Sequence, residues 1–220
     1  MRKIVLTICS VSLLNFFGAA QITKGSTLLG GSVTFGNSKT DPANGATYTK
    51  QINSSVGLSA GVAIKENLVA GGSLSYGHAK VQFVDPGDVT QTANKSNSYG
   101  AGTFLRRYIT LGKNFYLFGQ AGLNFGISKG EQPAGVNEKI ESKGWNISLN
   151  AAPGISYALT KKFQLELGFN DLVSLYYNKS SSESPGNGVP VTSKNRSYGL
   201  SSSLGTSAPL SIGFRLLFLK

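Results

Sequence analysis

Three charged residues stand inside segments that are mostly uncharged, and their chemistry is the easiest to anticipate. Arg106, Glu166 and Arg215 each stand among alternating apolar and small polar residues, far apart in the sequence. A charge that is buried without a partner is costly, so buried charged groups pair with one another. We therefore expect an ion-pair cluster of these three residues. It would either fill and stiffen the interior of the fold or gate a narrow pore through it.

Catalytic and metal chemistry have few candidate residues. The chain holds one histidine, His78, and one cysteine, Cys9, which are too few for a zinc or iron–sulfur site built from such ligands. Asp85 and Asp88 follow the histidine, but Asp-Pro-Gly-Asp is typical of a turn. No nucleophile, base and orienting group can be identified from spacing. We expect no catalytic residue, metal or cofactor, and hence no enzyme; an enzyme that uses His78 at the rim of the fold is the third alternative.

The composition indicates a β-rich single domain. Of 220 residues, 28 are glycine, which is about an eighth, and only 14% are charged. Soluble domains average roughly 7% glycine and 25% charged residues. A hydrophobic share of 40% argues against disorder, which needs low hydrophobicity and high charge. Glycine at this frequency also argues against a helical bundle, because each glycine inside a helix costs about 1 kcal/mol.

The first twenty residues have the features of a secretory signal peptide. Arg2 and Lys3 precede an apolar run over residues 4–17, and small residues end the segment at Ala20. The run is shorter than the roughly 20 residues that a membrane-spanning helix needs. We predict a signal peptide over 1–20 and one domain over 21–220, with a retained N-terminal anchor as the alternative. Cys9 would leave with the peptide.

Beyond residue 25 the hydrophobic pattern has a period of two, which is typical of strands with two different faces. Short turns alternate along the chain with long polar loops over 37–51, 82–97, 129–143 and about 177–206. This alternation predicts an up-and-down meander of antiparallel strands. The expected strands lie near 26–36, 52–64, 68–81, 98–110, 115–128, 144–159, 163–176 and 207–219.

The two faces of these strands differ in a way that indicates a lipid environment. One face is apolar over about ten residues, the length of a tilted strand across a bilayer. The other face carries Gly, Ser and Asn together with the three charges, whereas a secreted ligand-binding barrel, the alternative, has an apolar interior. Because lipid cannot satisfy an open sheet edge, the sheet must close. Aromatic residues at the ends of the apolar stretches predict two interfacial girdles; they include Tyr76, Tyr99 and Trp145 toward the long loops and Phe115 and Phe163 toward the short turns.

Three segments carry a resemblance to a known family: 99–108 (YGAGTFLRRY), 113–122 (KNFYLFGQAG) and 212–218 (IGFRLLF). With them, the chain beyond the signal peptide resembles the small outer-membrane β-barrels of Gram-negative bacteria, the eight-stranded porin-like proteins. The resemblance implies an outer-membrane location and folding by the barrel-assembly machinery, which in this family recognises a final strand that ends in an aromatic residue. Phe214 and Phe218 are the residues that match, although Phe218 stands third from the end.

The sequence thus predicts a single all-β domain, an eight-stranded antiparallel up-and-down transmembrane β-barrel. Its interior is narrow enough for side chains to fill. We expect a non-enzymatic scaffold that supports the envelope and presents extracellular loops for surface interaction, with a narrow gated pore for ions or very small solutes as the alternative. The expected partners are outer-membrane lipids and a surface ligand of the loops, where Tyr48, Phe83, Tyr177 and Tyr198 lie. Ten basic and eight acidic residues share the loops, which argues against nucleic-acid binding.

Overall fold

Ten antiparallel strands make up the regular structure of the described residues. They are β1 (Thr27–Thr40), β2 (Tyr48–Lys65), β3 (Leu68–Val84), β4 (Thr92–Thr110), β5 (Phe115–Pro133), β6 (Lys139–Ala158), β7 (Phe163–Phe169), β8 (Val173–Ser184), β9 (Val191–Ser202) and β10 (Leu210–Phe218). The computed structural model describes residues 22–40, 48–84, 92–112, 114–134, 138–169, 172–185, 190–202 and 210–218. Within these ranges no helix has the length and apolar character needed to cross a membrane.

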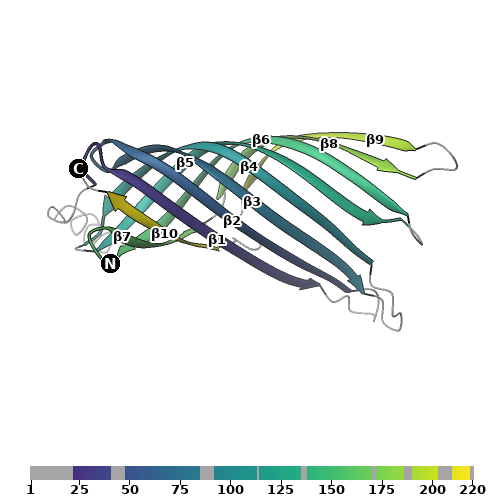
Figure 1. Ribbon diagram of the computed structural model, residues 1–220, viewed down its shortest axis with the longest axis horizontal. Helices are drawn as coiled ribbons and strands as arrows, with labels where there is room; N and C mark the ends of the chain where they lie inside the picture. The colour runs from purple at the N-terminus through teal and green to yellow at the C-terminus, as the bar shows by residue number, and fades with distance from the viewer. Residues whose placement is uncertain are drawn as a thin grey trace, which may run out of the picture.

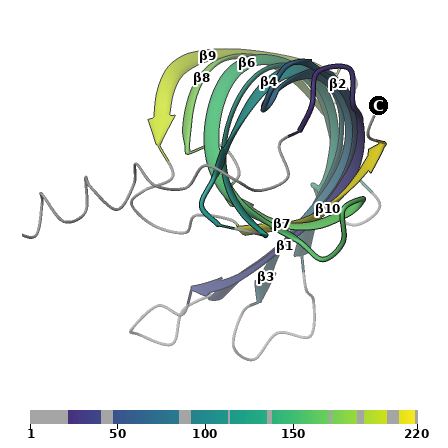
Figure 2. The ribbon, with the colours of Figure 1, turned by 90° about the vertical axis from the view of Figure 1, so that its left-hand side faces the viewer.

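Eight of the strands close into a barrel (Figures 1 and 2). Each of β1 to β6 pairs with the next, β6 pairs with β7, β7 with β10, and β10 returns to β1. β8 and β9 continue the sheet from the far part of β6, beyond the stretch that β7 covers. The all-β, antiparallel, up-and-down fold expected from the sequence is therefore confirmed.

The number of strands is ten instead of eight, and both extra boundaries fall between residues 163 and 206. The expected strand over 163–176 is two strands placed end to end along β6. β7 pairs with Gly154–Ala158, and β8 pairs with Glu141–Ala151. β9 lies within 177–206, where we expected a loop. Its sequence, VTSKNRSYGLSS, is mostly polar on both faces apart from Val191, Tyr198 and Leu200, so the alternation by which strands are identified is weak.

The barrel has two unlike ends. Connections of a few residues join β2 to β3, β4 to β5 and β6 to β7 at one end, where β1 begins and β10 finishes (Figure 1). We name this the turn end. At the other, the hairpin end, strands run past the predicted boundaries, so that much of the expected loops 37–51, 82–97 and 129–143 is strand.

Alternate side chains point out of the barrel and into its lumen. On β5, for example, Leu123, Phe125 and Ile127 are about half exposed on the outer surface. Asn124 and Gly126, between them, line the lumen. Large apolar side chains therefore cover the outside, and small polar ones cover much of the inside.

An apolar plug fills the lumen at the turn end. The chain before β1 helps to hold it, because Ile22 N–H donates to Asn67 Oδ1 (3.1 Å) and Asn67 N–H donates to the Ile22 carbonyl (3.0 Å). Asn67 has a φ of 56° in the tight turn between β2 and β3, a conformation that asparagine tolerates. The plug consists of Ile22, Leu28, Ala63, Val69, Phe104, Tyr108, Tyr116, Phe118 and Leu217.

Candidate functional site

The structure brings Arg106, Glu166 and Arg215 together across the lumen, next to the apolar plug. Arg106 Nη1 lies 2.7 and 2.8 Å from the two carboxylate oxygens of Glu166. Arg215 Nε lies 3.1 Å from each of the same oxygens, and its Nη1 donates to Ser59 Oγ at 2.6 Å. The three residues are only 6%, 8% and 6% exposed. One carboxylate thus joins two arginines from opposite parts of the sheet.

Neutral groups satisfy further donors of the cluster. Arg106 Nε and Nη2 both donate to Gln120 Oε1, at 2.8 and 2.6 Å. Tyr108 Oη lies 3.1 Å from Arg106 Nη1 and donates to Glu166 Oε1 at 3.2 Å. Such hydrogen bonds are what makes a buried ion pair tolerable, because they replace the water that the charges lose.

Aromatic rings of the plug support the cluster. The Arg106 guanidinium lies 4.1 Å from the centre of the Phe118 ring, within the range of a cation–π interaction. Phe104 packs against two glycines, Gly61 and Gly71, and a Cβ at Gly71 would lie 2.7 Å from the Phe104 ring. These glycines therefore leave room for the ring. The plug and the cluster together occupy the turn half of the lumen.

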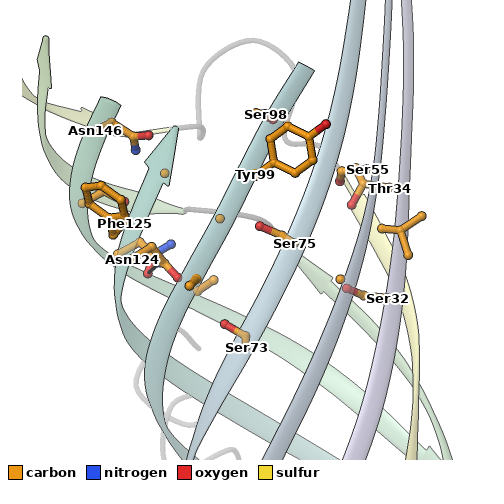
Figure 3. Close-up of a pocket in the computed structure, with 18 of the residues that line it drawn as sticks. Ser32, Thr34, Ser55, Ser73, Ser75, Ser98, Tyr99, Asn124, Phe125 and Asn146 are labelled. Atoms are coloured by element: carbon orange, nitrogen blue, oxygen red, sulfur yellow. Dashed lines mark hydrogen bonds between the residues drawn. The ribbon is translucent and has the colours of Figure 1, made fainter. Parts of the chain in front are cut away.

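A polar cup opens above the cluster, toward the hairpin end (Figure 3). Its volume is about 470 Å³, and none of the described residues that line it is charged. Hydroxyl groups come from β1 to β4, as Ser73 and Ser75 illustrate, and amides come from β5 and β6, as do Asn124 and Asn146. A second cavity of about 220 Å³ shares part of this lining and reaches Arg106, Glu166 and Arg215. The cup suits water or a small neutral polar solute.

His78 lies on the outer surface, not in the cup. Its Nδ1 is 2.8 Å from Asn97 Oδ1, which also accepts a hydrogen bond from Tyr76 Oη at 3.1 Å. Neither partner is a nucleophile. Asp85 and Asp88 lie outside the described residues. Within the part of the chain that the structure describes, no three His, Cys, Asp or Glu side chains gather as a metal site would require.

The predicted girdle residues lie on the outer surface near the two ends of the apolar zone. Toward the hairpin end, Tyr76 and Tyr99 pack at 5.3 Å between ring centres, and Trp145 packs on Tyr177 at 5.4 Å. Toward the turn end, Phe115 packs on Tyr157 at 4.7 Å, and Phe163 on Phe214 at 6.3 Å. Their contact with lipid headgroups stays a prediction.

Other predicted residues have mixed outcomes. Phe214 and Phe218 are exposed on the outer face of β10, and their recognition during assembly stays a prediction. The predicted signal peptide lies outside the described residues. The four aromatic residues expected in loops are in strands: Tyr48 in β2, Phe83 in β3, Tyr177 in β8 and Tyr198 in β9.

Sequence reasoning did not find the apolar plug or the neutral partners of the cluster. A signal was present, because Tyr116 and Phe118 share a face with Gln120 near the start of β5, and Tyr108 shares one with Arg106. Apolar residues confined to the turn end of the polar face would have predicted a filled lumen there.

Comparisons with known proteins agree with this geometry. A family model described as "Outer membrane protein beta-barrel domain" matches residues 6–202. The crystal structure of the outer membrane protein OprG from Pseudomonas aeruginosa is similar, with a TM-score of 0.56 and 16% identity over 92% of this chain and 100% of that one. A major outer membrane protein from Thermus thermophilus has a TM-score of 0.46 and 11% identity, over 88% and 99% of the two chains. No curated protein sequence matches the chain significantly.

The likeness to OprG supports the fold alone, because proteins of one fold have many functions. The family model, in contrast, spans most of the sequence, including the strands that carry Arg106 and Glu166. This chain therefore belongs to the outer membrane protein β-barrel domain family.

Proposed function

We propose that the protein is a non-enzymatic scaffold in the outer membrane of a Gram-negative bacterium. The turn end faces the periplasm and the hairpin end faces outward, because membrane barrels have short periplasmic turns and longer extracellular connections. The barrel supports the envelope and holds the outer hairpins in place for contact with surface molecules.

The filled turn half of the lumen is the observation that carries this proposal. Nine buried residues form the apolar plug, and the charged cluster of Arg106, Glu166 and Arg215 covers it. Moving a solute past these groups requires breaking buried ion pairs, which costs several kcal/mol unless new partners replace the lost ones. A barrel of eight strands is just wide enough for its interior to be filled in this way.

The long outer hairpins supply the contact surface. β8 and β9 pair along Val173–Ser184 and Val191–Ser202, and they extend to the hairpin end in Figure 1. Tyr198 and Leu200 of β9 are among the most exposed apolar side chains of the described residues. Exposed aromatic and apolar residues on a paired hairpin are suited to bind a partner surface.

Planar bilayer recording tests the scaffold proposal. The folded barrel, identified by a band that shifts on a gel when the sample is boiled, should give no steady channels after reconstitution, because the cluster closes the lumen. Discrete, reproducible openings would contradict the closed scaffold. A chain that stays soluble and monomeric without detergent would contradict the membrane placement itself.

A narrow gated pore is the second candidate. The 220 Å³ cavity favours it, because this cavity shares lining residues with the polar cup and extends to the charged cluster. If wild type conducts, Glu166→Gln should change the conductance or the open probability. If the conductance and open probability of Glu166→Gln equal those of wild type, the cluster is not the gate.

A further inference from the structure

Arg107 is a charged residue on the apolar outer wall of the barrel, near the turn end. It follows the buried Arg106 on β4, so its side chain points the opposite way, and it is exposed. Its neighbours on the same outward face, Leu105 and Ile109, are 47% and 53% exposed. A charge on a lipid-facing wall is unfavourable. Ionisable residues at membrane depth therefore pair with a specific group, and their presence indicates a functional site.

A break in strand register brings a second cation to the same face. Ala63 of β2 is opposite Val69 of β3, and both side chains are buried in the apolar plug. Lys65 would share that inward face, because side chains two residues apart lie on the same side of a regular strand. The register shifts at this point, however, and Lys65 is opposite Leu68 instead. A β-bulge redirects side chains in this way, and here it turns Lys65 outward.

The two cations stand in one row across three strands. Lys65 is opposite Leu68, and Leu68 is opposite Arg107 on β4. Directly opposite residues lie on the same face of a sheet, so the two exposed cations flank the half-buried Leu68 on the outer wall. Two strand spacings, about 10 Å, separate the Cα atoms of Lys65 and Arg107. Their long side chains can therefore reach one anion that lies over Leu68.

Hydrogen bonds fix the backbone beneath this pair of cations. Tyr108 N–H donates to the Asn67 carbonyl at 2.8 Å, which extends the ladder between β3 and β4 past Arg107. Asn67 is itself held by its two hydrogen bonds with Ile22. Gly119 is opposite Arg107 on β5, and a Cβ there would meet no atom within 4 Å. The Arg107 side chain thus has a fixed base and open space beside it.

Neither cation has an acidic partner among the described residues. The ion pairs there join Glu166 to the two arginines of the cluster, or lie at the hairpin end. Glu66 follows Lys65 in the turn, but no ion pair joins it to Lys65 or Arg107 within the described part of the chain. Two cations and one anion leave this corner of the barrel with a net charge of +1.

The segments outside the described residues supply no acidic partner near this corner either. The undescribed residues that adjoin the turn end are 1–21, 113 and 219–220, and their sequences contain no Asp or Glu. Asp171 belongs to the connection of β7 to β8, and β5 and β6 separate those strands from β4. The other undescribed acids belong to connections at the hairpin end: Asp41, Asp85 and Asp88. The counter-charge of Arg107 and Lys65 must therefore come from outside the chain.

We propose that Arg107 and Lys65 bind the phosphate group of a phospholipid in the periplasmic leaflet of the outer membrane. Arginine binds phosphate through paired hydrogen bonds, and lysine adds a compact point charge. The apolar wall of β2 and β3 ends in a turn at this row, which is where a lipid headgroup follows its acyl chains. Val62 and Leu105, exposed on the side away from the turn, lie beside those chains. The inference rests on the proposed membrane location with the turn end toward the periplasm.

Binding of phosphatidylglycerol to the folded full chain in detergent micelles tests the inference, and native mass spectrometry measures the lipid bound per barrel. K65Q/R107Q should bind about tenfold more weakly than wild type or worse, because each basic residue beside anionic lipid adds to the affinity. The matched control K161Q/K162Q removes the same charge from exposed residues of the turn between β6 and β7 and should bind like wild type. K65R keeps both charges and should retain binding.

Three probes identify what the site recognises: phosphatidylglycerol, diacylglycerol with the same acyl chains, and inorganic phosphate alone. We expect tight, salt-sensitive binding of the first only. Equal affinity for diacylglycerol overturns the inference, because the phosphate then contributes nothing. Equal losses in K65Q/R107Q and K161Q/K162Q also overturn it, because the attraction then belongs to the turn end as a whole. Inorganic phosphate that competes at a concentration similar to that of the lipid overturns it as well, since the site then takes a free anion.

A gel before and after boiling separates these outcomes from folding defects. K65Q/R107Q should fold at least as well as wild type, because it removes two charges from the outer wall. If the double variant does not fold, K65Q and R107Q are measured singly, and each should still bind more weakly than wild type. A barrel that inserts in lipid and gives no channels, yet binds the lipid equally without the two cations, refutes the site and leaves the scaffold intact. A wild-type chain that fails to enter lipid refutes the proposed location as well.

Discussion

Replacing Glu166 with glutamine is expected to lower the free energy of unfolding by about 3–5 kcal/mol. The carboxylate is 8% exposed and lies within 3.1 Å of both Arg106 and Arg215. Its neutralisation leaves two buried guanidinium groups without a counter-charge next to the apolar plug. Unfolding by urea in lipid vesicles, followed by fluorescence of Trp145, the one tryptophan of the chain, measures the loss.

Glu141→Gln is the matched control, because it makes the same chemical change at an exposed ion pair with a distance of 3.9 Å. It should alter stability by less than about 1 kcal/mol. Replacing all three members of the cluster with Met, Leu and Met should recover much of the loss, since apolar residues of similar volume are tolerated where a lone charge is not. If Glu166→Gln and Glu141→Gln have equal effects, the cluster contributes nothing specific to stability.

The substitution Leu149→Arg is expected to lower the free energy of unfolding of the barrel in a bilayer by about 2–4 kcal/mol. This is the range for a charge near the midplane on the lipid face. Leu149 is 54% exposed on the outside of β6, between Trp145 and Tyr157 of the same face. The guanidinium would stand in hydrocarbon, out of easy reach of either interface. The same urea titration in lipid vesicles measures this effect.

The adjacent residue provides the control, because it faces the other way on the same strand. Ser148 lines the polar cup of about 470 Å³, and an arginine there stays in contact with water. The substitution Ser148→Arg should therefore lower the free energy of unfolding by less than about 1 kcal/mol. Two substitutions with similar effects would mean that the outward and inward faces are wrongly assigned.

Prediction from the sequence succeeds where the two faces meet different solvents. Along β5, apolar Leu123 and Phe125 meet lipid while Asn124 meets the lumen, and this contrast produces a period of two. The same parity assigns Arg106, Glu166 and Arg215 to inward-facing positions, and their side chains meet in one lumen. Fold class and the position of the charges therefore follow from local pattern.

Prediction fails where both faces of a strand meet water. Beyond the girdle, β9 and the outer parts of β3 and β4 carry polar residues on both sides, so their sequences resemble loops. Register is the second missing quantity. Lys80 and Lys95 stand in separate stretches of sequence, and only strand pairing shows that they lie opposite each other. Gln120 and Ser59, as partners of the arginines, depend on the same information.

Closure of the sheet between β1 and β10 has a consequence for how the chain folds. Thr27 pairs with Phe218, and Arg215 reaches Ser59, 156 residues away. Contacts of such long range form late and slowly, because the entropy of closing a large loop must be overcome first. Until β10 arrives, β1 and β7 each expose an edge that can pair wrongly with another chain. Folding intermediates of this barrel therefore need protection from aggregation up to the final strand, and the rate of the last pairing sets the time for which they are vulnerable.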